Sequence, residues 1–135
     1  MANVLILEDD YPLAKIWREA LIESGHTATL AFTSSEAISH VENEKFDAYI
    51  IDLKIEIDIK SITDSGVKFL SYLHRIMTPA QIEGRVIGVS GLVIDSDPRQ
   101  SRHAFEMFDV KHFLPKPFDP SLLVTIIEEQ VPDVA

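Results

Sequence analysis

The sequence predicts an α/β fold in which five parallel strands form one doubly wound sheet, a (βα)5 arrangement. Two observations predict it. Short apolar runs alternate with amphipathic segments five times along the 135 residues, and this repetition is typical of a parallel sheet with helices on both faces. The first run is apolar at every position rather than at alternate ones, as expected of a strand that is buried on both faces.

Five short runs are the expected strands. They are Val4–Leu7, Thr27–Phe32, Ala48–Asp52, Arg85–Ser90 and His112–Leu114. The third ends on a carboxylate, the fourth ends on a hydroxyl, and the fifth runs into Lys116. In a doubly wound sheet, binding sites form beyond the carboxyl ends of the strands, so these polar residues are candidates for a site.

Capping residues and turn formers mark the first two helices. Asp10 can cap a helix that has Pro12 in its first turn, and Ser24–Gly25 ends it. Its apolar residues recur at helical spacing: Leu13, Ile16, Trp17, Ala20 and Leu21. Trp17 is expected to face the core. The capping box Thr33–Glu36 begins a second helix that runs to about Asn43.

Three more helices are expected in the second half of the chain. They cover Val67–Ile76, then Asp97 through Phe108, and last a segment capped by Asp119–Pro120. Pro79 keeps the first of these from continuing far, because proline disrupts a helix interior.

Bulk composition limits the function. The net charge of −10 disfavours binding to nucleic acid, since an acidic domain repels phosphates. The chain has no cysteine, which excludes thiolate catalysis and cysteine zinc sites. No apolar run has the roughly 20 residues of a membrane span. We expect one domain over residues 1–135, without an attached output domain, in the cytoplasm.

Carboxylates from separate strand ends are predicted to converge. Glu8 and Asp9 follow the first strand and Asp52 ends the third. Such a group repels itself unless a cation or proton lies within it, and Mg²⁺ with oxygen ligands suits a site that handles phosphate. Lys116 offers a compact positive charge and Ser90 a hydroxyl donor. This combination indicates phosphoryl transfer to a carboxylate, by positioning and charge neutralisation.

Four stretches, in order, resemble the receiver domain of two-component response regulators (CheY-like). They are Val4–Asp10, Ile50–Leu53, Val86–Gly91 and Phe113–Phe118. The resemblance runs the whole chain. It implies a flavodoxin-like sheet with strand order 2-1-3-4-5, and a signalling domain that catalyses only its own phosphorylation and dephosphorylation.

By this resemblance, Asp52 is the phosphoacceptor and a metal ligand. Asp9 binds Mg²⁺ directly, Glu8 orients metal-bound water, and Lys54 offers its backbone carbonyl to the metal. Asp10 is expected to cap a helix rather than to bind the metal.

The resemblance also implies a switch. Ser90 and Lys116 bind the phosphoryl oxygens, and Phe113 takes the aromatic switch position on the fifth strand. Ser90 and Phe113 then shift the face formed by the fourth helix, the fifth strand and the fifth helix. The phosphoryl donor is a histidine kinase, a phosphotransfer protein or a small phosphodonor, and a downstream effector reads the switched face. The Lys116–Pro117 bond is expected to be cis.

The segment after Asp52 departs from the family pattern. Glu56 stands where proline is usual, and the plausible family glycine is Gly66, fourteen residues after the acceptor, so an insertion is expected at about residues 54–65. Apolar and charged residues alternate over Lys54–Lys60, as in an extended strand. The insertion is either a loop folded back over the sheet end or a β-arm that pairs with a partner or with a second copy, giving a homodimer.

Residues beside the site tune the phosphoryl lifetime in this family. Lys54 is two residues after the acceptor, and Leu92 is two after Ser90. Gly91, directly after Ser90, leaves an open approach to the site.

Three other functions share part of this residue pattern. A dehalogenase-type Mg²⁺ enzyme needs a second acid two residues after the nucleophile, where this chain has Lys54. A flavin-binding relative is disfavoured because the cofactor phosphate would meet Glu8, Asp9 and Asp52. A phosphorylation-independent pseudo-receiver, acting as an interaction module, remains the alternative. The sequence leaves open whether the chain is a stand-alone regulator, a phosphorelay shuttle or a fragment of a larger protein.

Overall fold

The computed structural model describes residues 1–52, 66–91 and 109–132. Two predicted segments lie outside these residues: the helix from Asp97 through Phe108 and the alternating segment Lys54–Lys60.

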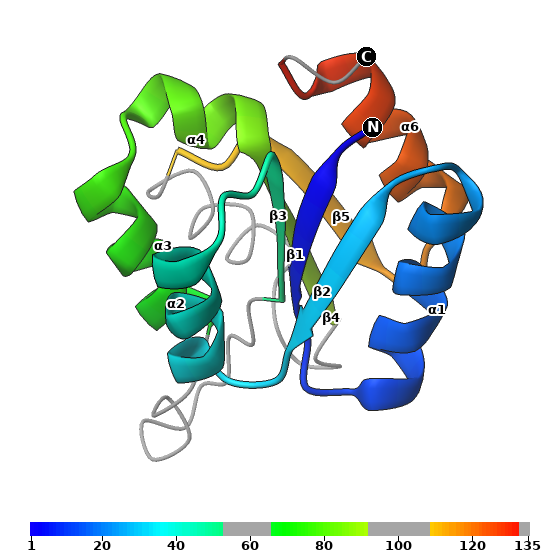
Figure 1. The fold of residues 1–135 in the computed structure, drawn as a ribbon. Coiled ribbons are helices and arrows are strands. Elements are labelled where there is room, and N and C mark those ends of the chain that lie inside the picture. The colour runs from blue at the N-terminus through cyan, green and yellow to red at the C-terminus, as the bar shows by residue number, and fades with distance from the viewer. Residues whose placement is uncertain (53–65, 92–108, 133–135) are drawn as a thin grey trace.

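Five parallel strands form one sheet (Figure 1). They are β1 (Asn3–Leu7), β2 (Thr27–Ala31), β3 (Ala48–Asp52), β4 (Val86–Gly91) and β5 (His112–Lys116). Their spatial order is β2-β1-β3-β4-β5, which confirms the predicted doubly wound fold. β3 is buried along its whole length, whereas the edge strands β2 and β5 are partly exposed.

The described helices cover both faces of the sheet. They are α1 (Tyr11–Glu23), α2 (Ser34–Asn43), α3 (Gly66–Ile76), α4 (Pro79–Arg85) and α6 (Ser121–Gln130). α1 and α6 lie against one face, and α2, α3 and α4 lie on the other (Figure 1). Within the described ranges, no helix combines the length and the apolar character that crossing a membrane requires.

α1 begins as predicted, but its buried face differs from the expected stripe. The side chain of Asp10 accepts a hydrogen bond from the backbone N–H of Leu13, which confirms it as the cap. The buried residues are Ala14, Trp17 and Leu21, whereas Ile16 is 50% exposed. Ile16 lies about 100° around the helix from Trp17, so a stripe centred on Ala14, Trp17 and Leu21 leaves Ile16 at its edge.

α4 is a helix that the sequence analysis missed. Pro79 was interpreted only as an obstacle to the preceding helix, but it occupies the first turn of a new one, where its missing N–H costs nothing. Thr78 and Gln81 form a reciprocal capping box around this start.

Alternate residues of the central strands build two separate cores. Leu5, Leu7 and Ile51 pack toward α2, α3 and α4, while Ile6 and Ile50 pack toward α1 and α6. This is the period of two expected for a strand between two helical layers. The two packed layers fix the sheet, and therefore fix the polar residues at its carboxyl edge.

Candidate functional site

Three acidic side chains gather at the carboxyl edge of the sheet. Asp52 is the last residue of β3, and Glu8 and Asp9 directly follow β1. Their carboxylate oxygens lie within 4.8 Å of one another. Glu8 and Asp52 are buried whereas Asp9 is exposed. Two desolvated acids and one open to solvent are a donor set that suits a hard divalent cation which keeps part of its water.

Glu8 is held at both carboxylate oxygens. Its Oε2 accepts a hydrogen bond from Nζ of Lys116 at 2.6 Å, and its Oε1 accepts one from the backbone N–H of Asp10 at 3.1 Å. Burial, followed by the negative charge of Asp52, raises the pKa of Glu8 from 4.5 to about 7, against the lowering effect of these two hydrogen bonds. Glu8 is therefore fixed in place, and without a bound metal its carboxyl group holds a proton more readily than an exposed glutamate does.

Lys116 reaches across the sheet edge to two strands. It ends β5, and besides Glu8 its Nζ lies 3.4 Å from Oδ2 of Asp52. Its bond to Pro117 is cis, as predicted. In this described cluster of three carboxylates, the ammonium group of Lys116 pairs with Glu8 and Asp52. The cluster therefore keeps an excess of negative charge when all three are ionised, which favours a second cation.

The remaining predicted site residues are only partly described. Ser90 and Gly91 are the last two residues of β4, and the register sets Ser90 opposite Pro115 and Gly91 opposite Lys116. β4 is also the neighbour of β3, where Asp52 pairs with Val89. The backbone of Ser90 thus lies between the strands that carry Asp52 and Lys116.

Three other predicted positions have different outcomes. Phe113 lies in β5, half-buried against the core beneath α2, α3 and α4. Lys54 and Leu92 lie outside the described residues.

Gly66 lies directly against the end of β3. The sequence indicated it only as a family position. It is the first residue of α3, and a Cβ atom added to it would lie 2.5 Å from the backbone oxygen of Asp52 and 2.7 Å from Cγ2 of Ile51. No side chain fits between α3 and the end of β3 without moving Asp52. Sequence reasoning identified Gly66 only as the plausible family glycine, displaced by the insertion, and the close approach itself appears only in three dimensions.

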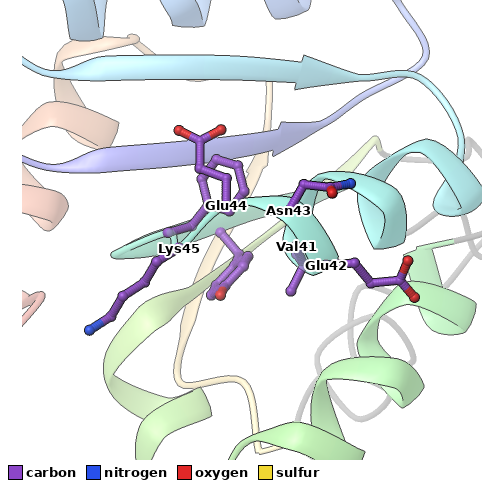
Figure 2. Close-up of a pocket in the computed structure, with 7 residues that line it drawn as sticks. Val41, Glu42, Asn43, Glu44 and Lys45 are labelled. Atoms are coloured by element: carbon purple, nitrogen blue, oxygen red, sulfur yellow. The ribbon is translucent and has the colours of Figure 1, made fainter.

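A hollow of about 390 Å³ lies elsewhere, at the amino end of β3 (Figure 2). Its walls are Val41–Phe46, which run from the last residues of α2 toward β3, together with Tyr49 of β3. None of these lining residues belongs to the predicted site, and Asp52 ends the same strand at its far end. The hollow is therefore separate from the acidic cluster.

Comparisons with known proteins indicate the family of this chain. The family of response regulator receiver domains matches residues 4–128. Among curated proteins, the probable transcriptional regulator ycf29 of Porphyra purpurea is 29% identical over 96% of this chain and 56% of its own length. The transcriptional regulatory protein CrdR of Helicobacter pylori is 26% identical over 87% of this chain and 49% of its own. The chain thus spans about half the length of these curated relatives.

Solved structures share the fold. A CheY-like receiver domain protein from Methanospirillum hungatei has a TM-score of 0.74 at 22% identity, over 96% of this chain and 92% of that one. The receiver domain of the Francisella response regulator 1452 has a TM-score of 0.70 at 24% identity, over 93% of both chains. With the family match over residues 4–128, the conclusion is that this chain belongs to the response regulator receiver domains, the signalling domains of two-component systems.

Proposed function

We propose that this domain accepts a phosphoryl group on Asp52, with Mg²⁺, and thereby switches the surface that an effector reads. One observation carries the proposal: Asp52 is buried at the sheet edge with Glu8 and Asp9, and the ammonium group of Lys116 lies 3.4 Å from its carboxylate. A buried carboxylate beside a cation and a candidate metal site suits attack on phosphorus, because charge neutralisation is the main requirement of that reaction.

The donor set fits Mg²⁺. Asp9, Asp52 and the backbone carbonyl of Lys54 would hold the ion, and Glu8 would orient its water. Bound there, Mg²⁺ would supply neutralisation of the charge on the phosphoryl oxygens. In support, Glu8 is held by hydrogen bonds at both oxygens, and Asp9 is open to solvent, as a partly hydrated ion requires.

The chemistry is a transfer to oxygen. A carboxylate oxygen of Asp52 attacks the phosphorus of a phosphohistidine, the P–N bond breaks, and the electron pair leaves with the imidazole nitrogen. With acetyl phosphate the P–O bond breaks and acetate leaves. Lys116 neutralises charge on the transferred oxygens, and the hydroxyl of Ser90 donates to one of them. Water later attacks the acyl phosphate and releases inorganic phosphate, which resets Asp52.

Phosphorylation would act on a pre-existing conformational equilibrium. Ser90 and Phe113 would couple Asp52 to the face formed by the helix expected at residues 97–108, β5 and α6. Moving such an equilibrium from mostly off to mostly on takes roughly 5 kcal/mol of differential binding. Two or three charge-assisted contacts at roughly 1.5–3 kcal/mol each supply that amount.

A cytoplasmic histidine kinase or phosphotransfer protein would donate the phosphoryl group. The curated relatives are named as transcriptional regulators, so an effector that binds DNA is the proposed output, while this acidic domain makes no nucleic-acid contact of its own. We propose that residues 1–135 form a single receiver domain with an insertion at about 54–65, and that Lys54, Gly91 and Leu92 tune the phosphoryl lifetime.

Acetyl phosphate tests the proposal. With Mg²⁺, the wild-type chain should gain one phosphoryl group by intact-protein mass spectrometry, and should gain none when the metal is chelated. Asp52→Asn should gain none. Asp10→Asn is the matched control, because Asp10 caps α1 and asparagine caps equally well. Labelling that survives in Asp52→Asn contradicts the proposal.

A further inference from the structure

An aromatic ring from α1 lies beside the ammonium group of Lys116. Nζ of Lys116 is 5.6 Å from the centroid of the Trp17 ring. A cation within about 6 Å of a tryptophan ring is attracted to its electron-rich face. The sole tryptophan of the chain thus contacts the one lysine that touches the described acidic cluster.

Trp17 is itself rigidly held. It is 1% exposed, in the core between the sheet and the helices α1 and α6. Its ring stacks on Phe118, with centroids 5.4 Å apart and an angle of 23° between the ring planes. Phe118 is two residues after Lys116, so the same segment supplies the cation and the second ring. The buried ring of Trp17 therefore lies beside the ammonium group of Lys116. The stem of a lysine is flexible, so contacts such as this one determine where its ammonium group lies.

Two kinds of contact act on this lysine. Glu8 and Asp52 attract the ammonium group by charge, but both carboxylates are needed by the incoming metal and phosphoryl group. Trp17 is neither a proposed metal ligand nor a proposed phosphoryl contact, so its contact with Lys116 does not compete with that chemistry.

We infer that Trp17 is a positioning residue for phosphoryl transfer: its ring face holds the ammonium group of Lys116 toward Asp52 while the carboxylates engage metal and phosphoryl group. This inference rests on the proposed function, since it assigns Trp17 a part in that reaction. A tryptophan that merely filled the core would be replaceable by any apolar side chain without loss of rate in the folded protein.

Substitutions separate the two roles. Trp17→Leu keeps an apolar side chain and removes the ring, whereas Trp17→Phe keeps a smaller ring. Leu21→Ala is the matched control, because Leu21 is buried one turn further along the same helix and in the same core. Initial rates of labelling by acetyl phosphate are measured at saturating Mg²⁺, on variants shown to be folded by their thermal unfolding.

Trp17→Leu should lower the maximal rate by about fivefold to tenfold, which corresponds to losing about 1–1.4 kcal/mol of cation–π attraction to a partly exposed ammonium group. The acetyl phosphate concentration for half-maximal rate should change little. Trp17→Phe should recover most of the rate, and Leu21→Ala should lower the unfolding temperature without slowing labelling. Wild-type rates in Trp17→Leu, or equal slowing in Leu21→Ala, overturn the inference.

A second measurement needs no substitution and no reaction. In the nuclear magnetic resonance spectrum of the wild-type chain, the ε-methylene protons of Lys116 should be shifted upfield by the ring current of Trp17. Shifts at ordinary lysine positions overturn the inference alone. A wild-type chain that takes up no phosphoryl group overturns the proposed function, and this inference with it.

Discussion

The ammonium group of Lys116 lies 2.6 Å from Oε2 of Glu8, an ion pair between residues 108 positions apart in the chain. It joins the end of β5 to the end of β1 and supplies positive charge to a carboxylate that is almost completely buried. This pair is therefore part of the fold as well as of the proposed site.

Removing the lysine should destabilise the metal-free protein. Lys116→Met leaves Glu8 and Asp52 without their cation, and we expect the free energy of unfolding at pH 8 to fall by about 1–3 kcal/mol. Urea denaturation in the presence of a chelator measures it. Lys15→Met is the control, since Lys15 and Glu19 form an exposed pair at 4.0 Å, and such pairs contribute little. If Lys116→Met and Lys15→Met lower the free energy of unfolding equally, Lys116 does not stabilise the buried carboxylates.

The raised pKa of Glu8 predicts how stability depends on pH without metal. In the folded protein this pKa is about 7, above the ordinary 4.5, mainly because the carboxyl group is buried. The folded state therefore holds the proton more tightly than the unfolded state. The contribution of Glu8 is fully present below about pH 4.5 and is lost as pH rises through about 7.

Between pH 5 and 8, the wild-type free energy of unfolding should fall by up to about 3 kcal/mol on this account. Glu8→Gln cannot titrate, so its curve should be flatter, and it should be the more stable protein at pH 8. Urea denaturation at several pH values, with chelator, gives both curves. If the free energies of unfolding of the wild type and of Glu8→Gln depend on pH in the same way, Glu8 is not the group that titrates.

The close approach of Gly66 to Asp52 predicts an effect on both stability and site. Gly66→Ala places a Cβ atom 2.5 Å from the backbone oxygen of Asp52, so α3 or the end of β3 must move. We expect a loss of about 1–3 kcal/mol in the free energy of unfolding and slower phosphoryl uptake.

Gly84→Ala is the matched control for that change. Gly84 lies within α4, and an added Cβ atom would meet nothing closer than Pro132 at 3.4 Å. Alanine should stabilise this helix by roughly 0.5–1 kcal/mol. Full activity in Gly66→Ala would show that the contact with Asp52 relaxes without consequence.

His26 predicts a stability effect at the opposite end of the sheet. Its Nδ1 accepts a hydrogen bond from the backbone N–H of buried Ala2 at 3.0 Å, and its Nε2 lies 3.1 Å from Oε1 of Glu128 on α6. Since Nδ1 is the acceptor, Nε2 carries the proton in the neutral ring. His26→Leu removes the acceptor of the Ala2 N–H, and it should lower the free energy of unfolding by about 1–3 kcal/mol.

Glu128→Gln provides the comparison for His26. The side chain of Glu128 is 49% exposed, and glutamine keeps a carbonyl acceptor. Glu128→Gln should therefore lower the free energy of unfolding much less than His26→Leu does. Chemical denaturation at pH 8 measures both. Similar losses in the two variants would mean that the exposed contact, rather than the buried one, stabilises this region.

Much of the fold could be predicted because its signals are local. Runs such as Ala48–Asp52 are apolar throughout, and Asp10 caps α1 within three residues of its own position. The convergence of Glu8, Asp52 and Lys116 also followed from the sequence, since each lies at the end of a parallel strand and such ends meet at one edge.

Other features depend on three-dimensional distance. The sequence analysis missed α4 because it treated Pro79 only as a residue that ends the preceding helix. Proline is equally suited to the first turn of a helix, and this is where Pro79 lies. The contact of His26 with Glu128 joins residues 102 positions apart, and that of Trp17 with Lys116 joins α1 to β5. No spacing in the sequence indicates either contact, and the raised pKa of Glu8 depends on its burial and on the nearby charge of Asp52.

The most direct test of the central claim is to locate the phosphoryl group on the chain. The wild-type protein is treated with acetyl phosphate and Mg²⁺, the acyl phosphate is trapped by borohydride reduction, and the peptides are sequenced by mass spectrometry. The account predicts that residue 52 alone is recovered as the reduced product. Reduction at Glu8 or Asp9, or at no carboxylate, would contradict it.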